Sequence, residues 1–432
     1  MKRRRFLAMA AGASLAQIAL GAQAEGAESA AGAAIRQSRE IGLAALGVSE
    51  RDLQHGLELH AASIVMEPYG FAPRAAIDGA AVARLVEQGG SDREVDLLMD
   101  EMENTRFVLD ESERREFIEA WRAAGMTCIF QNAGQESQDP VRLLRRLGNF
   151  TFALDMMPDF FVRATAAGDI ERAKRDGKAA LALSVNGVPL LQRWESVQDE
   201  LSLIRVFHQL GVRMMHLTYN RQNMIGSGAG EREDPGLSDF GRAVVAEMNR
   251  VGVLVDVAHS GPQTSLQAAQ ASSKPMVISH SACAALSGHF RCKPDNVIRA
   301  VAETGGLMGI CAVPQFLGGK GDINTLLDHV DHAVKVAGID HVAIATDYSY
   351  RSTAAGREFQ KVPRRPRHRP DWESLWPIPL GPTPPSQRTM AWTNWPLFTA
   401  GLVQRGYRDA DIQKIIGGNA VRVVNATFPQ RA

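Results

Sequence analysis

Three successive stretches decide the fold: Arg213–Tyr219 (RMMHLTY), Phe240–Arg250 (FGRAVVAEMNR) and Gly252–His259 (GVLVDVAH). The first and third are short and mainly apolar, as buried strands are. The middle stretch is longer and amphipathic, with apolar residues at helical spacing. A strand, a helix and a second strand in this order predict two parallel strands joined by a crossover helix.

The same alternation continues along the chain, and eight apolar runs can be counted. They are Ser63–Glu67, Met126–Gln131, Ala180–Asn186, Arg213–Tyr219, Gly252–His259, Pro275–His280, Gly306–Val313 and His341–Asp347. Eight strand–helix units are the number at which a parallel sheet closes on itself. The predicted fold class is therefore α/β, a (β/α)8 barrel of the TIM type.

The expected domain organisation has three parts. Residues 1–24 are expected to be an export signal, residues 25–60 a helical segment, and residues 61–432 a single barrel domain. A Pro- and Arg-rich insert at about 351–390 interrupts the barrel pattern and carries the basic patch Arg364–Arg369. The insert is long enough for a lid. Anion recognition by the patch and a solvated loop without a partner are the alternatives.

The first residues have the pattern of a signal for export. Lys2-Arg3-Arg4-Arg5-Phe6-Leu7 precedes an apolar run from Ala8 to Leu20, and Ala22-Gln23-Ala24 resembles a cleavage site. The adjacent arginines are similar to a twin-arginine signal, and an ordinary secretory signal is the alternative. Both predict a periplasmic or secreted protein. No later apolar run is long enough for a transmembrane segment, and none is expected.

Composition narrows the classes of function. The chain has 45% apolar and 22% charged residues, which is ordinary for a globular protein. Lys plus Arg and Asp plus Glu both number 48, so no nucleic-acid partner is expected. None of the four cysteines forms a Cys-x-x-Cys pair. Cys283 and Cys292 are expected either to form a disulfide or to remain buried thiols.

Polar residues end several of the expected strands. In a barrel of this type, the carboxyl ends of the strands converge on the active site. His259 and His280 end consecutive strands, and Asp347 ends the last one. Two imidazoles from neighbouring strands can reach one metal ion, and a nearby carboxylate can move a proton.

The residues around these strand ends resemble the membrane (renal) dipeptidase family of zinc hydrolases. The resemblance runs from about Leu59 to the C-terminus, with the insert matching poorly. Its motifs are Gly236-Leu237-Ser238-Asp239-Phe240-Gly241, Val255-Asp256-Val257-Ala258-His259, Ile278-Ser279-His280-Ser281, Gly305-Gly306-Leu307, Thr346-Asp347-Tyr348 and Gly417-Gly418-Asn419-Ala420-Val421-Arg422-Val423. The resemblance implies that His259 and His280 bind zinc, that Asp347 handles the catalytic proton, and that Arg291 binds the substrate carboxylate.

Other positions depart from the family pattern. The family's first strand ends in Asp-Gly-His-Asn-Asp, whereas this chain has Glu67-Pro68-Tyr69-Gly70-Phe71. The bridging Glu of the family is Asn186 here, and its substrate-facing His is Tyr219. Phe has no ligand atom and neutral Asn is a weak ligand, so the second site is expected to be lost. We expect one zinc, held by His259 and His280 with the Asn186 carbonyl oxygen.

The resemblance implies a metallohydrolase that cleaves a dipeptide or a similar small amide bearing a carboxylate, and the expected signal makes it an exported one. Its expected nucleophile is a water on a single zinc. Asp347 and Tyr219 are the expected catalytic residues, with Tyr219 donating to the oxyanion, and Arg291 and Tyr69 are expected to face the substrate. The family also suggests a homodimer. One alternative is a metal-free pseudoenzyme or ligand-binding protein on the same barrel. Another is a metal-free hydrolase in which Glu67, Tyr69 and Asp347 transfer protons.

Overall fold

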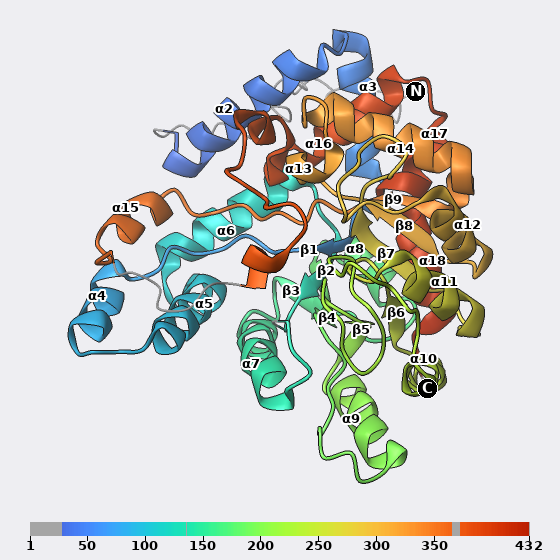
Figure 1. Cartoon of the computed structure of the whole chain (residues 1–432). Helices are drawn as coiled ribbons and strands as arrows, with labels where there is room; N and C mark the ends of the chain where they lie inside the picture. Colours follow the sequence, from blue (N-terminus) through green and yellow to red (C-terminus); the bar gives the residue numbers. More distant parts are fainter. Residues whose placement is uncertain (1–27, 135, 365–371, 432) are drawn as a thin grey trace.

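The computed structural model describes residues 28–134, 136–364 and 372–431, and its centre is a barrel of parallel strands surrounded by helices (Figure 1). The expected export signal and most of the basic patch lie outside the described residues. The barrel strands are β1 (Met66–Gly70), β2 (Cys128–Asn132), β4 (Ala179–Val185), β5 (Val212–His216), β6 (Leu254–Asp256), β7 (Val277–Ser281), β8 (Leu307–Ile310) and β9 (Val342–Ile344). They pair in this order and confirm the predicted TIM-type fold.

One short strand was not expected. β3 (Phe161–Arg163) pairs in parallel with β4 outside the barrel path. The expected strand ends also run too far for β5 and β6, because pairing stops at His216 and at Asp256. Tyr219 and His259 therefore lie on the loops that follow these strands.

Helices cover the outside of the barrel. The longer ones are α2 (Ala30–Leu46), α3 (Glu50–Ala62), α4 (Gly79–Glu87), α5 (Asp92–Leu109), α6 (Glu111–Ala124), α7 (Pro140–Met156), α9 (Val197–Gln209), α10 (Asp239–Val251), α11 (Pro262–Ala271), α12 (Asp295–Glu303), α14 (Ile323–Ala337), α16 (Trp395–Gln404) and α18 (Asn419–Thr427). The shorter helices and turns are α8 (Asp169–Arg175), α13 (Pro314–Leu317), α15 (Ala355–Gln360), α17 (Asp409–Gln413), η1 (Ile339–His341), η2 (Trp372–Leu375), η3 (Pro385–Met390), η4 (Trp392–Asn394) and η5 (Lys414–Gly418). None of the described helices is both long and apolar enough to cross a membrane.

Local sequence explains why these helices begin and end where they do. The Ser238 side chain accepts from the Gly241 amide and caps the start of α10. The same helix ends at Gly252, whose φ of 87° is the left-handed conformation that favours glycine. This cap turns the chain directly into β6.

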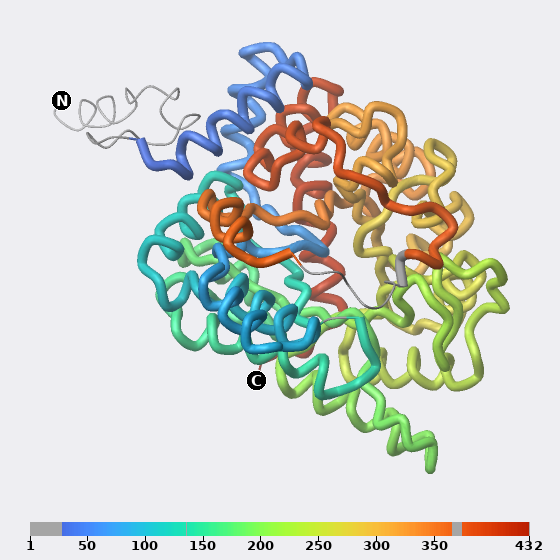
Figure 2. The backbone as a smooth tube through the Cα atoms, turned by 60° about the vertical axis from the view of Figure 1, so that its left-hand side comes forward, coloured from blue at the N-terminus to red at the C-terminus, as the bar shows by residue number. Residues whose placement is uncertain are grey.

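Two segments that are far apart in the sequence pack together. α3, near the N-terminus, lies against α16, near the C-terminus, and Figure 2 shows the blue and red segments side by side. A Cβ at Gly56 would lie 2.5 Å from the Cα of Ala400, so only glycine permits this close approach.

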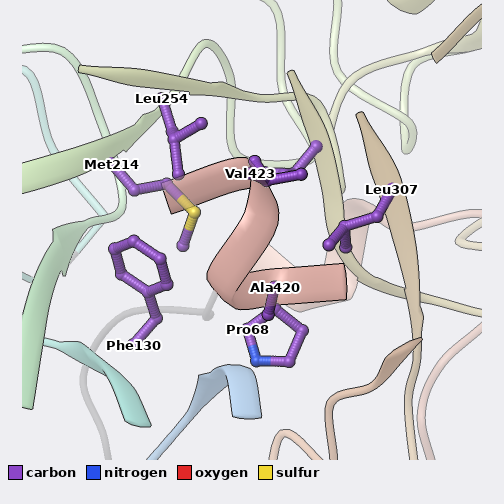
Figure 3. A pocket seen from close by; sticks show the side chains of 8 residues that line it. Pro68, Phe130, Met214, Leu254, Leu307, Ala420 and Val423 are labelled. Carbon is purple, nitrogen blue, oxygen red and sulfur yellow. The ribbon is translucent and has the colours of Figure 1, made fainter. Parts of the chain in front are cut away.

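The amino-terminal end of the barrel is filled by apolar side chains. A small pocket there is lined by Pro68, Phe130, Met214, Leu254, Val277, Leu307, Ala420 and Val423. Figure 3 shows Ala420 and Val423 of α18 facing the strand residues across this space. The lining offers no charged group, so the chemistry of the barrel lies at its other end.

Two irregular strands shape that other end. The pairing register of β1 shifts between Glu67 and Gly70, and that of β7 shifts between Ile278 and Ser281. A regular strand places alternate residues on one face. Here Met66 and Tyr69, three residues apart, both belong to the core inside the barrel. The shift in β7 likewise brings His280 onto the Tyr69 ring.

All four cysteines are buried free thiols in the structure, so Cys283 and Cys292 take the second of the two expected states.

Candidate functional site

His259 and His280 face each other at the carboxyl end of the barrel. Their Nε2 atoms are 3.0 Å apart, and both side chains are buried. Burial, together with the nearby Arg291 charge, lowers the pKa of both rings well below the usual range. Neutral imidazole is the form that binds metals.

His259 is oriented by an amide on the preceding loop. Its Nδ1 donates to Oδ1 of Asn220 over 2.9 Å, because an amide oxygen can only accept. Nε2 of His259 consequently presents a lone pair toward His280. Asn220 holds this position with a φ of 58°, a left-handed conformation that asparagine tolerates well.

Two further polar residues lie beside this pair, and sequence reasoning missed both. His216 ends β5 and Asp256 ends β6, and the two are partners in the strand register. Nε2 of His216 lies 2.5 Å from Oδ2 of Asp256, and both side chains are fully buried. Ligand atoms of His216, Asp256 and His280 all lie within 4.8 Å of one another.

Strand periodicity could have revealed them. Met214 and Leu254 point into the barrel, so residues two positions later face the same way. Those residues are His216 and Asp256. These residues were missed because the two strands were expected to extend to Tyr219 and His259, and polar residues were considered only at those ends.

The hydrogen bonding of this pair is incomplete. Oδ1 of Asp256 accepts from the amides of Ala258 and Ser279, at 2.9 and 3.1 Å. Within the described chain, Oδ2 of Asp256 and both ring nitrogens of His216 complete no regular hydrogen bond. Burial by itself would raise the pKa of Asp256, but His216 and these donors outweigh it and lower the pKa. The carboxylate therefore stays charged.

The opposite side of the site is built differently. Asn132 donates to the Tyr69 hydroxyl at 2.9 Å, and that hydroxyl donates to Oδ1 of Asn186 at 3.0 Å. The Tyr69 ring stacks on His280 with centroids 3.9 Å apart. Phe71 meets Tyr69 edge to face at 5.9 Å. These contacts occupy the positions where the family pattern would place the second set of metal ligands, and they hold the Asn186 oxygen in a hydrogen bond.

Asp347 and Tyr219 lie closer to solvent. Oδ2 of Asp347 is 4.0 Å from Nε2 of His280, and its side chain is 22% exposed. Burial raises the pKa of Asp347 to about 7, although Arg291 and Arg74 oppose the rise. A carboxyl group with this pKa can take up and release a proton near neutral pH. The Tyr219 ring stacks on His259 with centroids 3.9 Å apart.

Arg291 is buried close to His259. Its Nη1 donates to the Ala258 carbonyl, and its guanidinium lies 5.3 Å from the centre of the Phe316 ring. Nε and Nη2 find no hydrogen-bond partner among the described residues. A buried guanidinium with two free donors is suited to a carboxylate.

Glu67, considered above as a proton-transfer group, faces away from the histidines. It accepts from the Thr346 amide and hydroxyl and from Nε1 of Trp392. Burial raises its pKa to about 8 despite these donors. The residue thus positions the segment that leads into Asp347, which follows Thr346 directly.

The donor set fits a divalent metal ion. We name His216, His259 and His280 the histidine cluster; their ring centroids are 4.9 to 5.6 Å apart. Imidazole nitrogens and a carboxylate oxygen are the ligands that zinc takes in proteins. Nε2 of His216 and Oδ2 of Asp256, which contact each other, are atoms that an ion would bind.

Comparisons with known proteins agree with this reading. Residues 113–364 match the family model described as membrane dipeptidase (peptidase family M19). A dipeptidase of Claviceps purpurea, tcpJ, is 28% identical over 315 residues, 72% of this chain. The aligned region spans 62% of that relative's length.

Solved structures share the fold. An amidohydrolase from Pseudomonas aeruginosa is 26% identical, with a TM-score of 0.63, and the match covers 86% of this chain and 99% of that one. A metallopeptidase from Rhodobacter sphaeroides, bound to a phosphinate mimic of the dipeptide L-Ala-D-Ala, is 17% identical with a TM-score of 0.58. That match covers 85% of this chain and 100% of the other. The family match spans more than half of the residues, and the chain therefore belongs to the membrane dipeptidase family, peptidase family M19.

Proposed function

We propose that the chain is an exported, zinc-dependent hydrolase that cleaves a dipeptide or a similar small amide bearing a carboxylate. Membership of a metallopeptidase family implies that the protein binds metal. The observation that carries the proposal is the convergence of buried ligand atoms of His216, Asp256 and His280, which all lie within 4.8 Å of one another beside His259. Zinc bound there supplies a Lewis acid that polarises the scissile carbonyl and acidifies water.

The chain's own residues supply substrate binding. Arg291 offers two free donors on a buried guanidinium, which suit the carboxylate of a small peptide. Buried charge-assisted hydrogen bonds of this kind are stronger than neutral ones and fix orientation as well. The site thus selects a substrate with a carboxylate a short distance from the amide to be cleaved.

Proton transfer is assigned to Asp347. Its Oδ2 lies at the edge of the histidine cluster, on the side that reaches solvent. With a pKa of about 7, it accepts a proton from the attacking water and returns it to the leaving amine. Tyr219, stacked on His259, is positioned to donate to the oxygen that gains negative charge.

The location follows from the first residues of the chain. The basic start, apolar run and small-x-small site over Lys2–Ala24 support export to the periplasm or the medium.

The test is hydrolysis of a dipeptide panel that includes L-Ala-D-Ala, measured by release of free amino acids. Asp347→Asn should lower kcat by about 10²- to 10⁴-fold, because the proton acceptor is lost. Asn tolerates the φ of 59° at this position, so thermal unfolding should be unchanged. Purified protein without zinc and without hydrolysis of any dipeptide would contradict the proposal and favour a metal-free ligand-binding protein.

A further inference from the structure

We propose that His216 and Asp256 bind the divalent metal ion together with His280, so that the ion lies deeper in the barrel than a site built on His259 and His280 alone. This inference rests on the proposed metal dependence and identifies the ligands. Neither residue belongs to the ligand set that the family resemblance implies.

Geometry provides the first argument. The three side chains come from three consecutive strands, β5, β6 and β7, and their ligand atoms lie within 4.8 Å of one another. Ligand atoms around a tetrahedral zinc are about 3.3 Å apart, since each bond is about 2.0–2.1 Å long. To reach this spacing, the His216–Asp256 contact, now 2.5 Å, would have to open, and separations of up to 4.8 Å to His280 would have to shorten.

The second argument is the incomplete hydrogen bonding of buried atoms. A buried polar atom without a partner costs about 1–3 kcal/mol. Nδ1 of His216 is in this state in the described part of the protein, whereas its Nε2 and Oδ2 of Asp256 have only each other, 2.5 Å apart. By contrast, the Asn186 oxygen, at the place of a family ligand, already accepts from Tyr69.

The charge of the site gives a third argument. Asp256 is a fully buried carboxylate whose Oδ1 is satisfied by two backbone amides. Its Oδ2 faces one imidazole and no Arg or Lys side chain forms an ion pair with it in the described residues. A divalent cation balances that charge and uses the free oxygen as a ligand.

The sequence also places other ligand types on the neighbouring strands. The chain carries Tyr69, Phe71 and Asn186 where the family pattern has metal ligands. His216 and Asp256 offer an imidazole and a carboxylate on β5 and β6, although Asp256 itself belongs to one of the motifs shared with the family. His259 remains next to His280, with the two Nε2 atoms 3.0 Å apart.

The experiment measures zinc bound to the purified full-length protein and to four variants, His216→Asn, Asp256→Asn, His259→Asn and His55→Asn, by elemental analysis after dialysis against zinc. His216→Asn and Asp256→Asn should each reduce bound zinc at least tenfold and abolish the rise in thermal unfolding temperature that zinc gives the wild type. Asp256→Asn keeps the oxygen that accepts from the Ala258 and Ser279 amides, which favours correct folding. His55→Asn, at an exposed position outside the site, is the control and should bind zinc as the wild type does.

The outcomes separate this inference from the proposed function. If His216→Asn and Asp256→Asn keep full zinc while His259→Asn loses it, the inference is wrong and metal-dependent hydrolysis stands. If the wild type binds no zinc, both fail. Circular dichroism of each variant without metal confirms that a loss of zinc reflects the missing ligand rather than unfolding.

Discussion

The two sides of the carboxyl end of the barrel differ in how completely their buried polar groups are hydrogen-bonded. On the tyrosine side, Asn132, Tyr69 and Asn186 form a chain of hydrogen bonds that is complete without any ligand. On the histidine side, Nδ1 of His216 and both Nε and Nη2 of Arg291 have no hydrogen-bond partner in the described residues, and Nε2 of His216 contacts only Oδ2 of Asp256. Buried polar groups in proteins are nearly always paired, so unpaired ones point to a bound species. The difference indicates that the histidine side is the one suited to bind a ligand.

The largest expected effect comes from converting the tyrosine side back to metal ligands. The triple variant Tyr69→His, Phe71→Asp and Asn186→Glu introduces an imidazole and two carboxylates at the positions of the family pattern. Restored ligands of this kind bind zinc with a free energy of about 10 kcal/mol. Zinc content should rise by about one ion per chain, measured by elemental analysis. Unchanged content would show that the first strand is aligned wrongly.

A smaller effect is expected on the histidine side when its free donors are removed. Arg291→Ala should lower kcat/KM for carboxylate substrates by about 10- to 100-fold, the value of charge-assisted hydrogen bonds. Matching carboxamide substrates should lose little. Arg291→Lys keeps a charge and a donor and serves as the control for folding. Equal losses on both substrate types would contradict the role of Arg291 in anchoring.

Removal of one oxygen atom interrupts the chain of hydrogen bonds from Asn132 through Tyr69 to Asn186. Tyr69→Phe removes the hydroxyl while the ring still stacks on His280. Asn132 and Asn186 then lose a partner, which should cost about 1–2 kcal/mol of unfolding free energy in urea. Zinc content should not change. A large loss of zinc in this variant would mean that Tyr69 supports the metal ligands more directly than its contacts indicate.

The last comparison is pH-dependent and concerns Glu67, a carboxyl group that protein donors alone satisfy. Its pKa of about 8 lies above the usual value near 4.5, so the folded state binds a proton more tightly than the unfolded state. Its contribution to stability therefore falls as pH rises from about 4.5 to 8, by at most about 1.4 kcal/mol per pH unit. In Glu67→Gln this fall should be absent. Urea unfolding at several pH values compares the two proteins, and parallel curves would contradict the shifted pKa.

Much of the fold was predictable because strand and helix periodicities are local properties of the sequence. All eight barrel strands overlap the expected runs, although β1 lies three residues later than expected, and β3 was missed because three paired residues leave almost no pattern. The meeting of His259 and His280 was expected from their position on neighbouring strands. Predicting His216 and Asp256 would have required the exact ends of β5 and β6. Register shifts such as those in β1 and β7 depend on tertiary pairing and are not visible in the local sequence.

The apolar layer beneath the site determines from which end of the barrel a ligand can reach it. α18 and the side chains around Met214 and Leu254 fill the amino-terminal end of the barrel, directly below His216 and Asp256. Under the proposed function, substrate therefore enters and product leaves at the same end of the barrel, the carboxyl end of its strands.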